Sequence, residues 1–217
     1  MRTLLVSLDT AGPLLALIAG VLLLKRPFNT KEIKWLLLYL LCGFLFNGAA
    51  NIISEWYEVN NHILYHIENL LNFILLSAFF SRLPLFEKYR RVFIYVVLFF
   101  VLANFSYKVA AGNYHTFDSF GFAWCSIMFT VYSLWYYSEM LQSQKGESLF
   151  SIPSFWFVTG ILIYYASCFF IFILYRHYTT MQNTAIGLLW RFQNVMLMIM
   201  SIFIVKGFVC QASHKSP

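Results

Sequence analysis

Seven polar side chains recur at helical spacing within an otherwise apolar stretch, residues 61–72. At about 100° per residue they form two adjacent stripes covering less than half of a helix, and isoleucines and leucines occupy the remainder. Imidazole, carboxyl, phenol and amide groups gathered on one side of a helix can hold a small polar ligand, an ion or a proton. One stripe holds Asn61, Tyr65, Glu68 and Asn72, and the other holds His62, His66 and Asn69.

His62 and His66 are four residues apart, the spacing that brings two imidazoles to one side of a helix for a bound metal. Glu68 points about 160° away from His66, and the H-E-x-x-H order is missing. A third ligand would have to come from a neighbouring connection, at His115 or His177. No lysine lies in the middle of a segment, as a retinal protein requires, and no two segments carry histidines that could face each other across a haem. Nucleotide-binding and serine-hydrolase motifs are also missing. We therefore expect no metal, no cofactor and no catalytic residues.

Other apolar segments carry polar side chains at a similar depth. At about 1.5 Å per residue, Asp9, Glu68 and Arg191 lie roughly 7–11 Å below the same membrane boundary. The helical phase predicts that Gln193, two residues after Arg191, projects elsewhere. The expected lining of a binding pocket is Asp9, Asn47, Asn51, His62, Tyr65, His66, Glu68, Asn69, Asn72, Arg191 and Asn194.

Three hypotheses account for this polar cluster. In the structural one, Arg191 pairs with Glu68 or Asp9, and asparagines hydrogen-bond between helices. In the second, the cluster is a pocket for an extracellular small molecule or ion. The third, translocation of protons or ions, requires a polar route to the opposite side, and beyond Asn72 the sequence offers little except Ser77 and Ser201.

The composition determines which elements position these residues. Of the 217 residues, 60% are hydrophobic and only 11% are charged, whereas soluble domains carry roughly 25% charged residues. A soluble fold of this length has too little interior for so many apolar side chains. Intrinsic disorder, a disulfide-rich secreted scaffold and a nucleic-acid-binding domain are excluded. The sequence predicts an all-α, multi-pass membrane protein with no soluble domain.

Seven segments are long and apolar enough to cross a bilayer, which requires about 20 residues. Short connections join them, so the whole chain, residues 1–217, forms one transmembrane domain. We take the first segment as a retained helix, because it lacks a small-residue cleavage site. The expected helices are 4–24, 35–54, 62–80, 92–108, 117–140, 154–175 and 185–206.

Lysine and arginine are distributed unequally between the two sides of this bundle. The positive-inside rule places the richer side in the cytoplasm, with the N-terminus outside and the C-terminus inside. Arg2, Lys108 and Arg176 lie on the poorer side. The richer side holds Lys25, Arg26, Lys31, Lys34, Arg82, Lys88, Arg90, Arg91, Lys145, Lys206 and Lys215.

Three stretches resemble a group of small bacterial seven-helix integral membrane proteins that are often encoded beside sensor histidine kinases. They are residues 62–80 (HILYHIENLLNFILLSAFF), residues 154–175 (SFWFVTGILIYYASCFFIFILY), and Leu189–Trp190 with Asn194. Members of the group commonly carry a His-Asn pair in the last helix, where this chain has Gln193 and Asn194. The resemblance implies a sensory or signalling accessory in the bacterial inner membrane.

These observations lead to one functional hypothesis and its alternatives. We expect a receptor-like protein that senses a small polar ligand or the state of the membrane through an outward-facing pocket. Its partners would be the lipid bilayer and a separate signalling protein, such as a sensor histidine kinase, and not nucleic acid. The alternatives are a small-solute or ion transporter or channel, a structural subunit of a membrane complex, and an intramembrane enzyme.

Overall fold

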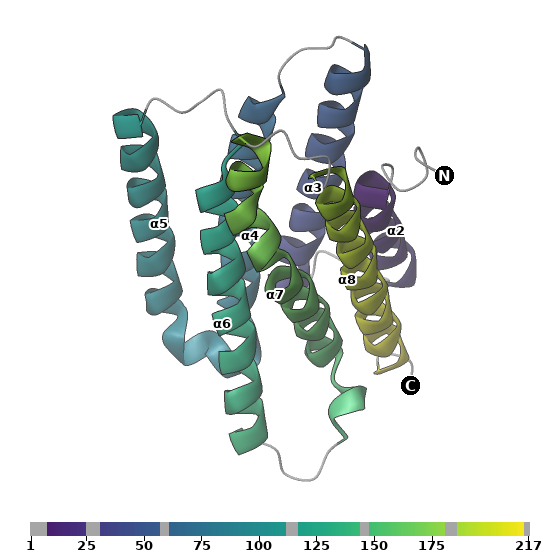
Figure 1. The fold of residues 1–217 in the computed structure, drawn as a ribbon. Coiled ribbons are helices and arrows are strands. Elements are labelled where there is room, and N and C mark those ends of the chain that lie inside the picture. The colour runs from purple at the N-terminus through teal and green to yellow at the C-terminus, as the bar shows by residue number, and fades with distance from the viewer. Residues whose placement is uncertain are drawn as a thin grey trace.

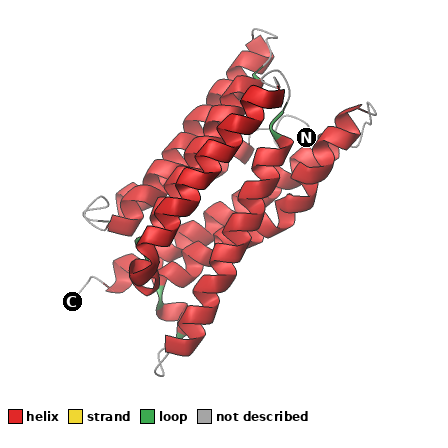
Figure 2. Ribbon diagram, turned by 90° about the vertical axis from the view of Figure 1, so that its left-hand side faces the viewer, coloured by secondary structure: helices red, strands yellow, loops and turns green. Residues whose placement is uncertain are grey.

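The computed structural model describes residues 8–24, 31–56, 61–111, 117–143, 148–180 and 186–214. Within them the chain is helical and has no strand. Seven α-helices run side by side along roughly one direction (Figure 1, Figure 2). They are α2 (Leu8–Leu23), α3 (Lys31–Trp56), α4 (His62–Phe80), α5 (Arg90–Ala111), α6 (Ser119–Ser143), α7 (Pro153–Thr180) and α8 (Ile186–His214). Two 3₁₀ turns, η1 (Pro84–Tyr89) and η2 (Leu149–Ser151), precede α5 and α7.

These helices confirm that the seven predicted segments are helical, with ends that differ by up to eight residues. The start of the first segment, residues 4–7, lies outside the described residues. Five stretches are long and apolar enough to cross a membrane: 31–53, 62–80, 84–109, 153–175 and 187–213. The chain is therefore a helical protein with the character of a multi-pass membrane protein. Of the other two helices, α2 is apolar but shorter, and α6 includes several serine and tyrosine residues.

The bundle closes through contacts between successive antiparallel helices. The extensive contacts join α2 to α3, α3 to α4, α6 to α7 and α7 to α8, and α8 also packs along α2. Glycines permit the close approach of α7 to α8. A Cβ atom at Gly160 would lie 2.9 Å from the backbone oxygen of Met200, and one at Gly207 would overlap the ring of Phe157.

Helix α5 is the exception, because it stands at the edge of the bundle (Figure 1). It is held mainly by two buried phenylalanines, Phe93 and Phe100, the second of which stacks on Phe73 with ring centroids 3.9 Å apart. Most of its other large apolar side chains are exposed: Val92, Ile94, Tyr95, Leu98, Phe99, Leu102, Phe105, Tyr107 and Val109. Such a surface fits a hydrocarbon environment.

The two ends of the bundle differ in chemistry. Helices α2, α4, α6 and α8 begin at the end that we name the polar end, which is uppermost in Figure 1. The opposite end, where α3, α5 and α7 begin, is named the basic end and holds Arg82, Arg90 and Arg91. The polar side chains singled out from the sequence lie towards the polar end.

Candidate functional site

The predicted polar cluster separates into three neighbouring groups of side chains. In the first, between α2 and α3, Asn51 donates from Nδ2 to both carboxylate oxygens of Asp9 at 3.2 and 3.4 Å. The same amide lies 3.2 Å from the hydroxyl of Thr10. Asp9 is buried, and no ion pair of the described residues includes it.

The second group surrounds Glu68 on α4. Asn47 of α3 and Asn72 of α4 donate from Nδ2 to the same oxygen, Oε1, at 3.2 and 3.4 Å. Asn47 also donates to the carbonyl of Gly43 at 2.8 Å, which fixes the direction of its amide. Glu68 is only 5% exposed, and no cationic side chain of the described residues lies within ion-pairing distance of it.

A small cavity of about 30 Å³ lies beside Glu68 in the centre of the bundle. It has space for one or two water molecules or an ion, whereas ligand pockets usually measure roughly 300–1,000 Å³. Its polar lining comes from α3, α4, α7 and α8: Tyr39, Asn47, Tyr65, Glu68, Asn69, Asn72, Tyr164, Tyr165 and Gln193.

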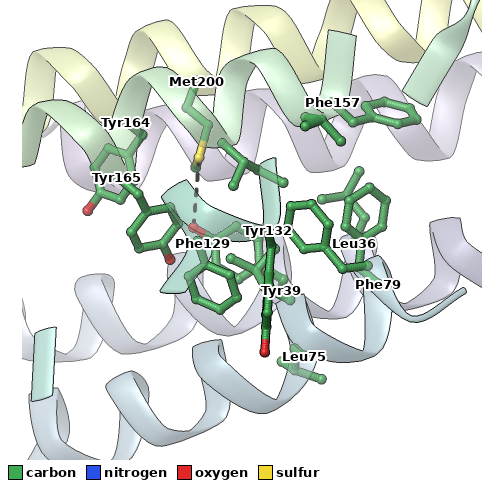
Figure 3. Close-up of a cluster of buried hydrophobic side chains, with 14 of the residues drawn as sticks. Leu36, Tyr39, Leu75, Phe79, Phe129, Tyr132, Phe157, Tyr164, Tyr165 and Met200 are labelled. Atoms are coloured by element: carbon green, nitrogen blue, oxygen red, sulfur yellow. Dashed lines mark hydrogen bonds between the residues drawn. The ribbon is translucent and has the colours of Figure 1, made fainter. Parts of the chain in front are cut away.

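Tightly packed aromatic side chains close this cavity on the side of the basic end. Figure 3 shows Tyr39, Tyr164 and Tyr165 gathered with Phe129 and Met200. The Tyr39 hydroxyl lies 3.9 Å from the Met200 sulfur, and the rings of Tyr165 and Phe129 are 4.8 Å apart. All five residues are at most 6% exposed. On this side the cavity is therefore bordered by a dense, largely aromatic core.

The third group joins α4 to α5 and α6 around Asp118, which is not among the site residues predicted from the sequence. Its Oδ2 atom lies 3.0 Å from Lys108 Nζ and 3.3 Å from His66 Nδ1, and it accepts a 3.4 Å hydrogen bond from Asn69. Its Oδ1 atom accepts the backbone N–H of Gly121 at 3.1 Å, so Asp118 also caps the N-terminus of α6. The side chains of Lys108 and Asp118 are 12% and 4% exposed.

A groove of about 400 Å³ lies beside this third group, whose charged side chains line one end of the groove. His66, Lys108 and Asp118 contribute the charged or titratable groups. The remaining wall is mostly apolar and comes from α5, α6, α7 and the residues just before α6: Tyr107, Phe117, Ser119, Phe120, Ala123, Trp124, Ile127, Phe169 and Ile173. Phe120 and Ile173 are more than half exposed, so the groove lies on the surface that faces the bilayer in a membrane-spanning bundle.

Helix α8 differs most from its predicted orientation. Gln193, expected to project elsewhere, is 9% exposed, lines the cavity beside Glu68 and donates to the Tyr164 hydroxyl at 3.4 Å. Arg191 is two residues earlier and therefore points about 160° away. The expected pairing is not present, because no ion pair joins Arg191 to Glu68 or Asp9.

The remaining predicted site residues lie near these groups. Tyr65 lines the cavity and packs edge-on against Phe117 and Trp190, with ring centroids 5.8 and 5.9 Å away. Asn194 is 1% exposed but is not part of the cavity lining. His62 is half-buried in the first turn of α4.

The structure gives no support to a metal bound at His62 and His66. Within the described part of the chain, no group of three or more His, Cys, Asp or Glu side chains could hold a metal ion. His115 lies outside the described residues, and so does the side chain of His177. The prediction that either completes a site therefore stays untested.

A further groove of about 240 Å³ lies at the basic end, between α4 and α5. Its wall is largely apolar and includes Trp35, Ile74 and Phe93. Arg82 and Arg90 also line it, and neither takes part in an ion pair with another described residue.

Comparisons with protein-family models, with curated proteins and with solved structures found no match.

Proposed function

We propose that the protein is a receptor-like membrane protein that binds an amphiphilic molecule in the groove beside α6. The observation that carries this proposal is the groove of about 400 Å³ that ends at His66, Asp118 and Lys108. Its volume falls within the range of ligand pockets, whereas the cavity beside Glu68 holds about 30 Å³. The binding site inferred from the sequence is thus moved from the centre of the bundle to its side.

The charged side chains at one end of the groove indicate which head group would bind. The carboxylate of Asp118 already pairs with Lys108 and accepts hydrogen bonds from Asn69 and from the N–H of Gly121. Lysine has three donors, and Asp118 is the single acidic partner of Lys108 among the described residues, so donors are left for a ligand. A head group with acceptor oxygens, such as a carboxylate or phosphate, suits them, and the apolar wall suits a hydrocarbon tail.

The position of α5 supplies a route for the signal. Near the polar end, Lys108 and Asp118 tie α5 to α6. At the other end of the same helix, Lys88 of η1 pairs with Glu139 of α6 at 3.0 Å, and the Tyr89 hydroxyl donates to Glu139 at the same distance. A ligand that competes for Lys108 would loosen α5 at one end and shift it against α6 at the other. A separate partner at that end, such as a sensor histidine kinase, would receive the change.

This function requires a defined orientation in the membrane. We infer that all seven helices cross the bacterial inner membrane, with the polar end outside and the basic end in the cytoplasm, since the basic end holds the excess of lysine and arginine. Reporter fusions after residues 86 and 146 should be active in the cytoplasm, and fusions after residues 58 and 180 should be active outside. The opposite pattern would place the groove in the wrong leaflet for an external signal.

Bromine quenching of tryptophan fluorescence tests binding in the groove, because Trp124 lies in its wall. A dibrominated fatty acid added to the protein in nanodiscs should quench the part of the emission that Trp124→Phe removes. Lys108→Leu should weaken this quenching several-fold, whereas Lys206→Leu, which changes an exposed lysine next to Trp156, should not. Hydrogen exchange in α5 should change when the fatty acid binds. Equal quenching in all variants would contradict the proposal.

Ion translocation is a second candidate, favoured by two buried carboxyl groups, Asp9 and Glu68, that form no ion pair with a described residue. The packed side chains of Tyr39, Tyr165 and Met200 oppose it, because they are at most 5% exposed and pack densely beside the cavity. Vesicles reconstituted with the protein would distinguish the two functions. A receptor produces no flux of protons or Na⁺ above that of empty vesicles.

A further inference from the structure

Glu68 and the amide groups around the central cavity are short of positive charge and of hydrogen-bond donors. Both amides that reach Glu68 donate to Oε1, and Oε2 accepts no hydrogen bond from a described residue. Two further acceptors, Asn72 Oδ1 and Gln193 Oε1, are buried and have no hydrogen-bond partner in the part of the chain that the structure describes. Glu68, Asn72 and Gln193 all line the cavity of about 30 Å³.

A buried, unpartnered acceptor and a buried carboxylate without a cation are each costly, because neither is compensated for the water it has lost. Water in the cavity would supply donors but no charge. A proton on Glu68 would cancel the charge but could reach only one of the other two acceptors. A metal cation supplies charge and satisfies several oxygen atoms at once, and hard cations prefer oxygen ligands.

The charge of the site selects the class of cation. Glu68 is the one carboxyl group in the lining of the cavity, so a single positive charge neutralises it. Divalent cations are usually held by more than one carboxylate or keep several waters, for which this cavity is small. We propose that Glu68, Asn72 and Gln193 form a binding site for one monovalent metal cation, with Na⁺ as the cation to test.

This site is distinct from the groove beside α6. Asn69 Nδ2 donates to Asp118 in the third group, whereas Glu68 faces Asn47 and Asn72. The cation would join α4 to α8, because Glu68 and Asn72 belong to α4 and Gln193 belongs to α8. Helix α3 is linked to the same carboxylate through the amide of Asn47. The cation would therefore stabilise the bundle whether or not the groove binds an amphiphile.

Thermal unfolding in detergent tests this site, comparing NaCl with choline chloride at equal concentrations. If Na⁺ binds only to the native state, the midpoint temperature of unfolding rises with the Na⁺ concentration. Above the Kd, each tenfold rise in Na⁺ lowers the unfolding constant tenfold. Glu68→Gln keeps the shape of the side chain and should abolish the difference between the salts. Gln193→Leu should raise, at least several-fold, the Na⁺ concentration required for a given rise in the midpoint temperature. The control Glu139→Gln, which changes a carboxyl group outside the cavity, should respond as the unchanged protein does.

Direct binding of radioactive sodium to the unchanged protein decides the question even if Glu68→Gln does not fold. One ion per chain, displaced by unlabelled Na⁺ and not by choline, is expected. Unfolding that is identical in the two salts, together with no bound sodium, would overturn the proposal and leave a protonated Glu68. Sodium binding that survives in a folded Glu68→Gln variant would overturn it as well, because the ion would then lie elsewhere.

Discussion

Replacement of Asp118 by alanine is expected to be the most damaging single change at the polar end. The carboxylate caps α6 by accepting the N–H of Gly121, pairs with Lys108 and accepts a hydrogen bond from Asn69. His66 Nδ1 lies 3.3 Å from it. Loss of an N-cap costs about 1 kcal/mol, and removing one partner of a buried ion pair costs about 3–5 kcal/mol. These terms overlap, so we expect Asp118→Ala to lower the free energy of unfolding by about 4 kcal/mol, close to a thousandfold in the unfolding constant.

Lys108→Met should cost less, because Asp118 keeps Gly121, Asn69 and His66 as neighbours. The double variant should then be less destabilised than the sum of the two single changes by about 2 kcal/mol, within the range for residues in contact. Reversible unfolding in mixed micelles, with increasing dodecyl sulfate and tryptophan fluorescence as the signal, measures all three variants.

The control is Lys88→Met, which removes the other lysine–carboxylate pair of the described residues. The Lys88 side chain is 60% exposed, and exposed pairs contribute less than about 1 kcal/mol. If Asp118→Ala costs no more than Lys88→Met, or if Lys108 and Asp118 show no coupling, the pair does not hold α5 to α6. The proposed route of the signal would then have no physical basis.

Three further predictions concern other parts of the bundle. Arg191→Leu should change the free energy of unfolding by less than about 1 kcal/mol, because Arg191 forms no ion pair with Asp9 or Glu68; a loss of about 3 kcal/mol or more would indicate a buried partner. Gly160→Ala should lower the free energy of unfolding by roughly 1–3 kcal/mol, since its methyl group would meet the backbone of Met200. The control Gly187→Ala, whose methyl group would have no atom within 4 Å, should be neutral or slightly stabilising in the same unfolding assay. Arg82→Gln with Arg90→Gln should reduce the phosphatidylglycerol retained by the purified protein several-fold in native mass spectrometry; Arg91→Gln, outside the groove at the basic end, serves as the control, and an equal loss there would indicate only non-specific attraction.

The helices and the polar side of α4 could be predicted from the sequence. Apolar segments of about 20 residues leave few alternatives to membrane-spanning helices, because hydrocarbon requires every backbone polar group to be paired. Polar and ionisable side chains are also costly in hydrocarbon, so those in such a segment face inward, and Glu68, His66 and Asn69 are indeed buried. These inferences depend on positions within a single helix, where spacing determines direction.

Three features depended on the tertiary structure. The rotation of α8, which turns Gln193 inward and Arg191 away, is set by packing against α2 and α7. The meeting of Lys108, His66 and Asp118 depends on where α5 and α6 lie relative to α4, and the sequence spacing between helices does not encode that distance. The volumes of the cavity and the grooves depend on how side chains of several helices fill the space between them, since packing is a property of neighbours in space. A polar stripe on one helix is thus readable from sequence, whereas its partners and the space beside it come from the assembled bundle.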